Sequence, residues 1–453
     1  MHTFTKTTLA ASLGMLCQAA ISQQQVVRPA PVNLWMDVST SNFAGMPDME
    51  SMGAGGSLLG GLVGAASGNA GMGGALKTYG QARTFSMMPS RVLDIAFLNN
   101  AKPSIEVNQA IPAAMKMGDK LPLVPPVKTT AMRGEEREMP QNMERPKGRI
   151  LIYWGCSETV RSGQPRILDL AGDMTKFGNA FSGRFAPDRS VRTTERHAVY
   201  PNDKNTVNLS KDSSLTGEHQ LQGDGIPASM RFTLNQAQDI MPAIAMQSSG
   251  NPSSSIKLNW QSMSQAKAYF ISAFASNGND MVMWSSSESA DAGMGLMDYL
   301  PNATIDNWLR DRVLLQPTTT SCAIPQGIFA AKDGGRDSSG AMAQMVAFGG
   351  DSYIVHPPRP ADVKTPWNQE WAVRIRLKSQ AMASLGGEEN AGNTRRRAPA
   401  SANSPSANSA NTKAGSEQPG QPTQAESQTD NNGGLLGIPI PGVGGLLKGL
   451  FGR

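Results

Sequence analysis

The stretch EWAVRIRLK, residues 370–378, is the clearest fold signal in this sequence. Four large apolar side chains fall at every second position, at Trp371, Val373, Ile375 and Leu377. Three cationic side chains occupy alternate positions, at Arg374, Arg376 and Lys378. Because successive side chains of a strand point to opposite faces, the stretch predicts a strand with one apolar and one cationic face.

Strand-like runs of the same kind occur on both sides of this stretch. The clearest lie at residues 91–98, 149–154, 190–200, 229–234, 256–260, 268–274, 281–284, 341–348 and 353–356, with turn-rich pieces between them. One short helix is predicted within residues 304–315, with Thr304 as its N-cap. The sequence therefore predicts a mainly β fold with two β-sandwich-like, immunoglobulin- or fibronectin-like domains at residues 82–246 and 256–385. The polar stretch at 247–255 (QSSGNPSSS) is their expected boundary.

Within the second predicted domain, an alternating run (Ile256, Leu258, Trp260) is followed by a short turn and then by Tyr269. This arrangement resembles the second and third strands of a fibronectin type III-like domain, over residues 256–285. The resemblance implies a β-sandwich in which Trp260 and Tyr269 are core residues. It implies no activity, since such folds host many functions.

Residues 1–22 have the pattern of a secretory signal peptide. Residues 1–8 carry the cation Lys6 and no acidic side chain, and residues 9–21 are mostly apolar. Ala20 and Ser22 are the small residues expected before a cleavage site at Gln23. The apolar run is too short for a permanent membrane anchor. We therefore predict export to the periplasm or cell envelope, where association with the outer membrane is one expected location.

Export also bears on the cysteines. Cys17 lies inside the predicted signal peptide, which leaves Cys156 and Cys322 in the mature chain. Two cysteines in an oxidising compartment are candidates for a disulfide. The alternative is a pair of buried, unbonded thiols.

Residues 53–76 carry no charged side chain, and glycines recur at every fourth position, at Gly56, Gly60, Gly64 and Gly68. On a helix these glycines would share one face and form a groove for close packing, as in the glycine zippers of some bacterial envelope proteins, which the pattern resembles. Glycine also disfavours helix and is common in flexible linkers. Residues 23–81 are therefore predicted to be either a glycine-rich linker or a membrane or self-association segment.

The C-terminal part divides into two segments. Residues 386–434 are low in complexity and are predicted to form a disordered linker. Residues 435–453 form an apolar, cationic tail that is too short and too interrupted to span a membrane. Its last part is expected either to dock on a membrane surface or partner or to fray, and the contact residues would be Leu446, Leu447, Lys448, Leu450 and Phe451.

No motif in the sequence points to catalysis, a cofactor or a metal. The histidines beyond the signal peptide, His197, His219 and His356, lack metal-ligand spacing, and no CxxC, GxSxG, P-loop or GxGxxG occurs. The formal net charge is only +5. The nearest basic cluster, Arg184, Arg189, Arg192 and Arg196, is diluted by Asp188 and Glu195. We therefore expect no nucleic-acid or nucleotide partner.

The sequence is most consistent with an exported, non-enzymatic structural or interaction protein of the cell envelope. Its expected partners are an envelope protein, a membrane surface or further copies of itself. Two alternatives stay open at this point. One is a β-sandwich module that binds a carbohydrate or peptide, and the other is a periplasmic hydrolase.

Overall fold

The computed structural model describes residues 25–44, 79–83, 89–126, 148–169, 184–277, 280–291, 293, 295–330 and 341–385. The chain divides into two compact units, residues 1–389 and 390–453, and all described residues belong to the first. Every structural statement below concerns these residues.

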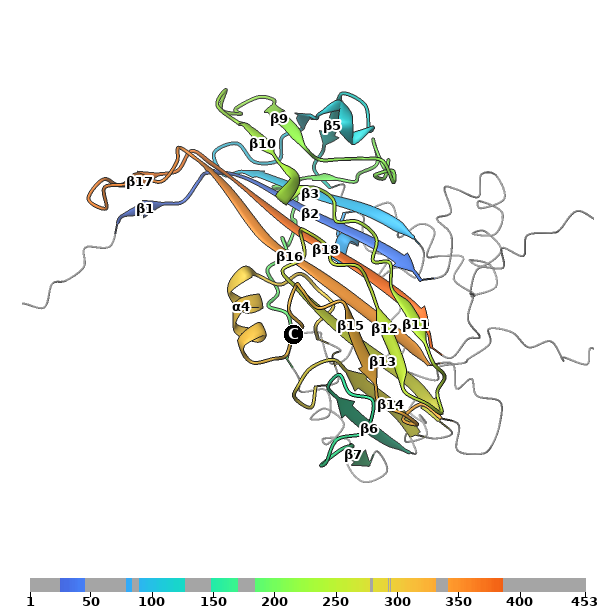
Figure 1. Ribbon diagram of the computed structural model, residues 1–453. Helices are drawn as coiled ribbons and strands as arrows, with labels where there is room; N and C mark the ends of the chain where they lie inside the picture. The colour runs from blue at the N-terminus through green and yellow to red at the C-terminus, as the bar shows by residue number, and fades with distance from the viewer. Residues whose placement is uncertain are drawn as a thin grey trace, which may run out of the picture. The chain divides into compact units, whose positions relative to one another are not determined.

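A nine-stranded mixed sheet is the largest element of the fold (Figure 1). From edge to edge its strands are β7 (Arg166–Asp169), β6 (Arg149–Trp154), β14 (Asp280–Ser285), β13 (Ala268–Asn277), β16 (Met342–His356), β18 (Trp371–Ser384), β2 (Val32–Phe43), β3 (Ser90–Asn99) and β8 (Ala198–Tyr200). β6 pairs with β14 in parallel, and so does β18 with β2; all other neighbours are antiparallel. The predicted mainly β class is confirmed.

Three smaller sheets accompany the large one. The first contains β10 (Arg231–Leu234), β9 (Gly217–Gln222), β4 (Val107–Ala110) and β5 (Lys120–Leu123). The second contains β11 (Gln247–Ser249), β12 (Ile256–Asn259) and β15 (Ser321–Ile324), and the third pairs β1 (Val27–Arg28) with β17 (Trp367–Asn368). Three short 3-10 helices complete the strands and turns, at η2 (Gln81–Arg83), η3 (Ala113–Met115) and η4 (Gln236–Gln238).

The main hydrophobic core lies between one face of the large sheet and two of the smaller sheets. β18 contributes Val373, Ile375 and Leu377 to this core, and the four-stranded and three-stranded sheets contribute residues such as Phe232 and Leu258. This packing of sheet faces is typical of a β-sandwich-like architecture. The apolar face predicted for residues 370–378 is therefore confirmed.

The two ranges predicted as separate domains share this large sheet. β6, from the first range, pairs with β14 from the second, and β18 lies between β16 and β2. Residues of both ranges also enter one core. Alternation in a sequence indicates which side chains share a face, but it carries no information about which strand lies alongside.

The structure differs from expectation within residues 23–81, where we predicted a linker or an association segment and no strand. β2 is a long interior strand that places Leu34, Met36 and Val38 in the core. Its opposite face carries Asp37, which is also buried. A buried acid within an apolar run obscures the alternation, because burial of a charge depends on a partner far away in the sequence.

The glycine-rich residues 53–76 lie outside the described residues, yet the topology shows where this segment is attached. β2 and β3 are antiparallel neighbours, and Ser41 lies opposite Ser90. The chain therefore leaves β2 and re-enters β3 at the same end of the sheet. Residues 53–76 belong to an insertion between two paired strands.

Replacing residues 47–76 with a short Gly/Ser linker is expected to leave the fold intact. Loop-closure entropy changes by only about 0.6 kcal/mol for each doubling of loop length, so the shortened loop should change the free energy of unfolding by about 1 kcal/mol or less. Urea denaturation measures this. A matched replacement of residues 47–83 also removes Ala82, which packs on Val92 and Tyr299, and should be clearly less stable. Equal loss in both variants would contradict the prediction.

The single described α-helix, α4 (Asn302–Arg310), begins two residues before the predicted N-cap Thr304. Pro301 occupies the N-cap position, and the Asn302 N–H donates to Asp351 Oδ1 at 3.1 Å. A carboxylate on β16 therefore satisfies a donor that a local side chain usually caps. Ile305 of α4 packs in a second core with Phe270 and Phe348, on the face of the large sheet opposite the main core.

Candidate functional site

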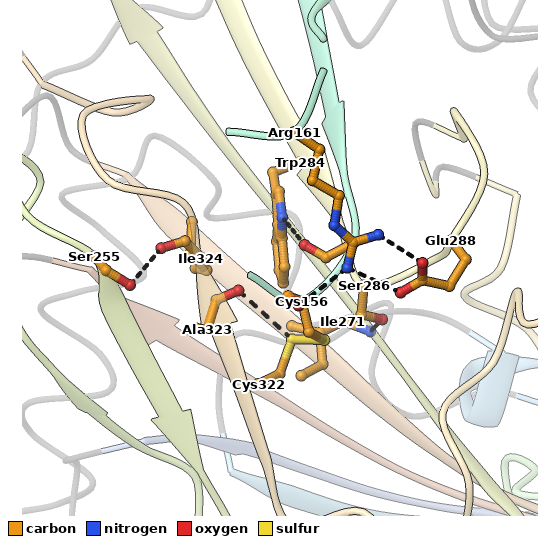
Figure 2. The surroundings of a disulfide bond; sticks show 11 residues. Cys156, Arg161, Ser255, Ile271, Trp284, Ser286, Glu288, Cys322, Ala323 and Ile324 are labelled. Carbon is orange, nitrogen blue, oxygen red and sulfur yellow. Dashed lines mark hydrogen bonds and ion pairs between the residues drawn. A yellow bond between two sulfur atoms is a disulfide. The ribbon is translucent and has the colours of Figure 1, made fainter. Parts of the chain in front are cut away.

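A disulfide joins two of the sheets. Cys156 follows the end of β6 in the nine-stranded sheet, and Cys322 lies in β15 of the three-stranded sheet. Their sulfur atoms are 2.04 Å apart. Figure 2 shows the bond between them. Cys322 is only 3% exposed, and both cysteines pack against the main core. The disulfide predicted between Cys156 and Cys322 is therefore present in the structure.

A tight turn at Gly155 directs the chain from β6 toward β15. Gly155 has a φ of +87°, in the left-handed region, and a Cβ there would meet the guanidinium of Arg161 at 2.5 Å. Its N–H donates to the Ser285 carbonyl at 2.9 Å. Its own carbonyl accepts from Trp284 Nε1 at 3.1 Å (Figure 2). Glycine is therefore favoured here by its backbone conformation, which other residues rarely adopt.

An ion pair covers the same turn. Arg161 donates from Nη1 to Glu288 Oε2 at 2.6 Å and from Nη2 to the Cys156 carbonyl at 3.1 Å (Figure 2). The two side chains are 37% and 42% exposed, so the pair itself adds little to stability. On the other side, the Ser157 N–H donates to the Ala323 carbonyl at 3.0 Å. The backbone around Cys156 is thus held by both sheets.

Trp260 and Tyr269, predicted as core residues, are both buried. Their exposed fractions are 5% and 0%, and their rings contact edge-to-face with centroids 5.7 Å apart. The Tyr269 hydroxyl accepts a hydrogen bond from the Met263 N–H at 2.9 Å. These contacts are structural. The resemblance to fibronectin type III-like domains remains a prediction.

The face of the large sheet opposite the main core carries a row of buried charges. The row crosses four adjacent strands, β16, β18, β2 and β3, through Asp351, Arg376, Asp37 and Asp94. Each side chain is a direct cross-strand neighbour of the next. None of the four residues is more than 8% exposed. The predicted cationic face of β18 is therefore a buried face.

Arg376 and Asp37 form the strongest pair in this row. Arg376 Nε donates to Asp37 Oδ1 at 2.7 Å, and Nη2 donates to Oδ2. Such bidentate pairs combine two charge-assisted hydrogen bonds. Burial alone would lower the pKa of Arg376, but the hydrogen bonds and charge of Asp37 outweigh it and raise the pKa. Arg374 Nη2 lies 3.8 Å from the same carboxylate.

Tyr299 and the segment before it cover the cationic end of the row. The Arg376 guanidinium carbon lies 4.5 Å from the centroid of the Tyr299 ring, and Lys378 Nζ lies 5.0 Å from it. Lys378 Nζ also donates to the Met297 carbonyl at 3.0 Å. Burial lowers the pKa of Lys378 to about 8. Arg376 and Lys378 therefore both stabilise the fold through their contacts with the Tyr299 ring.

Among the four residues of the row, Asp94 has the fewest partners to balance a negative charge. Its Oδ2 accepts from the Ala82 N–H at 2.7 Å, but its buried Oδ1 has no hydrogen-bond partner among the described residues. Burial raises the pKa of Asp94 to about 7, with a further increase from the charge of Asp37, against the lowering by backbone hydrogen bonds from Ala82 and Gly80.

The histidines are occupied by structural contacts. His219 is buried, lies stacked on Phe232, and its Nε2 is 2.8 Å from the Leu215 carbonyl. Burial lowers the pKa of His219 and of His197. His197 Nδ1 accepts from the Thr194 N–H at 3.1 Å, so the lone pair that a general base needs is in use.

Neither a cluster of metal-ligating side chains nor a membrane-spanning helix occurs in the part of the chain that the structure describes. No group of three or more His, Cys, Asp or Glu side chains there is arranged to hold a metal ion. No helix in that part is both long and apolar enough to cross a membrane.

The two predicted association segments lie outside the described residues. These segments contain Gly56, Gly60, Gly64 and Gly68, and Leu446, Leu447, Lys448, Leu450 and Phe451. Of the basic cluster, Arg184 lies near Asp291 and Arg192 near Asp188, at 3.8 Å and 3.7 Å. The expectation that no nucleic acid binds stays a prediction.

Sequence reasoning missed the buried row of charges. Asp37 and Asp94 each interrupt an apolar run, in VNLWMDVS and RVLDIAFL. An acid inside such a run is a signal, because a buried charge requires a partner. The signal does not say which cation that partner is.

Comparison of the chain with family models, with curated proteins and with solved structures finds no match.

Proposed function

We propose that the chain is an exported, non-enzymatic protein of the cell envelope, with a structural or interaction role. It would be attached to a membrane surface or an envelope partner through its glycine-rich insertion and its C-terminal tail. The observation that carries this proposal is the position of the strand ends from which these two segments continue.

The described strands that precede the two segments in the chain, β2 and β18, finish at the same end of the nine-stranded sheet. β2 and β18 are parallel neighbours, and Phe43 near the end of β2 lies beside Met382 near the end of β18. The Ala44 N–H donates to the Met382 carbonyl at 2.6 Å. The arrowheads of β2 and β18 point the same way in Figure 1. The chain therefore runs toward residues 53–76 and toward residues 435–453 from adjacent points.

Two association segments on one molecule suit an association role. When two weak contacts belong to one molecule, the second forms at a high effective concentration. The C-terminal tail does not need to span the membrane, because an apolar face with a few cations can lie in the interface. The folded sheets would then be held at the envelope through one end of the large sheet.

Two further features support export. Cleavage after Ser22 would leave Gln25 and its side-chain contacts in the mature chain. The Gln25 side chain, close to the new N-terminus, donates to the Thr365 carbonyl at 2.9 Å and accepts from Arg359 Nε at 2.7 Å. The disulfide is of the kind that persists in oxidising compartments.

The test is fractionation of cells that express the tagged full-length chain. We expect the wild-type protein in the envelope fraction, and we expect Gly60→Leu with Gly64→Leu to shift it toward the soluble periplasmic fraction. Ala65→Leu with Ala66→Leu adds the same kind of bulk outside the glycine repeat and should leave the protein in the envelope fraction. Deletion of residues 435–453 tests the C-terminal tail, and it should also shift the protein toward the soluble periplasmic fraction.

A wild-type protein that stays wholly in the soluble periplasmic fraction would contradict attachment. A wild-type protein that keeps residues 1–22 and stays in the cytoplasm would contradict export. Release by the alanine substitutions to the same extent as by the glycine substitutions would show that the glycine repeat has no special role.

A further inference from the structure

Residues 79–83 form a short docked segment over the buried row of charges. They belong to the insertion between β2 and β3 and follow its glycine-rich part in the chain. Ala82 is fully buried against Val92 and Tyr299, and its N–H donates to Asp94 Oδ2. Arg83 Nε donates to Asp298 Oδ2 at 3.1 Å, so the segment is held both by the sheet and by the chain before α4.

The carboxylate that holds this segment stands beside another carboxylate. Asp37 and Asp94 are directly opposite each other on β2 and β3. Like charges in this position repel, and here both side chains are buried. Asp37 is compensated by Arg376, whereas Asp94 receives only backbone donors and has one oxygen without a partner.

The charged and titratable side chains around Asp94 contact other groups. From β18, Arg376 and Arg374 are directed to Asp37, and Lys378 donates to the Met297 carbonyl. From the docked segment, Arg83 pairs with Asp188 and Asp298, and Tyr79 is an un-ionised phenol whose pKa is raised by burial. Tyr299, from the chain before α4, has a buried hydroxyl without a hydrogen-bond partner. None of the described cations forms an ion pair with Asp94.

We propose that docking of residues 79–83 on the sheet is coupled to protonation of Asp94, so that the segment is held with a neutral carboxyl and is released when Asp94 ionises. The insertion that carries the glycine repeat would thereby have a proton-sensitive attachment at its second end. The proposal concerns the folded chain in solution and does not depend on the envelope role.

The direction follows from linkage. Burial raises the pKa of Asp94 from 3.8 to about 7 in the docked state. A group whose pKa is raised by docking favours the docked state fully below its exposed pKa and loses this contribution as the pH rises to its docked pKa. Release of residues 79–83 should therefore increase between about pH 4 and about pH 7 and should level off above that. From pH 5 to pH 7.5 the increase should be roughly tens of fold.

Hydrogen exchange of the purified, full mature chain tests this. Exchange of the fragment that contains residues 79–89 is measured by mass spectrometry at pH 5 and pH 7.5, with times scaled for the intrinsic exchange rate. We expect protection of this fragment to fall by roughly tens of fold from pH 5 to pH 7.5, because Asp94 ionises over this range. A fragment from β13 in the middle of the large sheet serves as the reference and should keep its protection.

Asp94→Asn is the decisive variant. Its amide oxygen still accepts from the Ala82 N–H, and its NH2 group can donate to the Asp37 carboxylate, so docking should be equally strong at both pH values. Asp298→Asn weakens the Arg83 contact and should lower protection at both pH values by a similar factor. Protection that does not depend on pH in the wild type, or that falls as much in Asp94→Asn as in the wild type, would overturn the proposal.

Discussion

Reduction of the disulfide between Cys156 and Cys322 is expected to lower the free energy of unfolding by up to about 5 kcal/mol. The two cysteines are separated by 166 residues, and a loop of this length restricts the unfolded chain strongly. The closed loop contains β7 through β14, so it includes strands of the nine-stranded, four-stranded and three-stranded sheets. The effect should therefore extend to the whole described fold.

Urea denaturation with and without reductant measures this effect. Wild-type protein should unfold at a clearly lower urea concentration when reduced, without any substitution in its sequence. The Cys156→Ala, Cys322→Ala double variant should resemble the reduced wild type and should not respond to reductant. If reductant leaves the wild-type midpoint unchanged, or shifts the double variant equally, the disulfide does not stabilise the fold.

The sequence predicted the faces of strands better than their neighbours. In β18, the apolar residues Val373, Ile375 and Leu377 enter the main core as the alternation indicated. The pairing of this strand with β2, more than three hundred positions away, left no local trace. Such pairings depend on the shape and burial of surfaces that form only in the folded chain, and for this reason two separate domains were predicted where the strands share one sheet.

Of the candidate site, the sequence predicted the disulfide and did not predict the buried row of charges. The predicted export and the number of cysteines beyond the predicted signal peptide were sufficient to suggest that Cys156 bonds to Cys322, because only two candidates were left. Burial of Arg376 could not be inferred from its own strand, where it resembles a solvent-exposed cation. The covering groups come from residues 79–83 and from Tyr299, which are distant in sequence and have no periodic pattern.

Arg376→Met is expected to destabilise the protein by about 3–5 kcal/mol, because it leaves Asp37 charged, buried and without its bidentate partner. Methionine has a similar volume, so the loss reflects the charge more than a cavity. Both side chains of the pair are only 4% exposed, and water cannot replace the lost hydrogen bonds easily. Arg374, with Nη2 at 3.8 Å from Asp37, can compensate in part and favours the lower end of this range.

The matched control is Lys204→Met, which breaks the ion pair of Lys204 with Glu106 at 2.7 Å. These side chains are 56% and 48% exposed, so the loss should be below about 1 kcal/mol. Adding Asp37→Asn to Arg376→Met removes the uncompensated charge and should recover a large part of the stability. The urea midpoints of the wild type, the two single variants and the double variant measure these losses. Equal losses for Arg376→Met and Lys204→Met, or no recovery in the double variant, would show that the buried charge of Asp37 is not what the arginine balances.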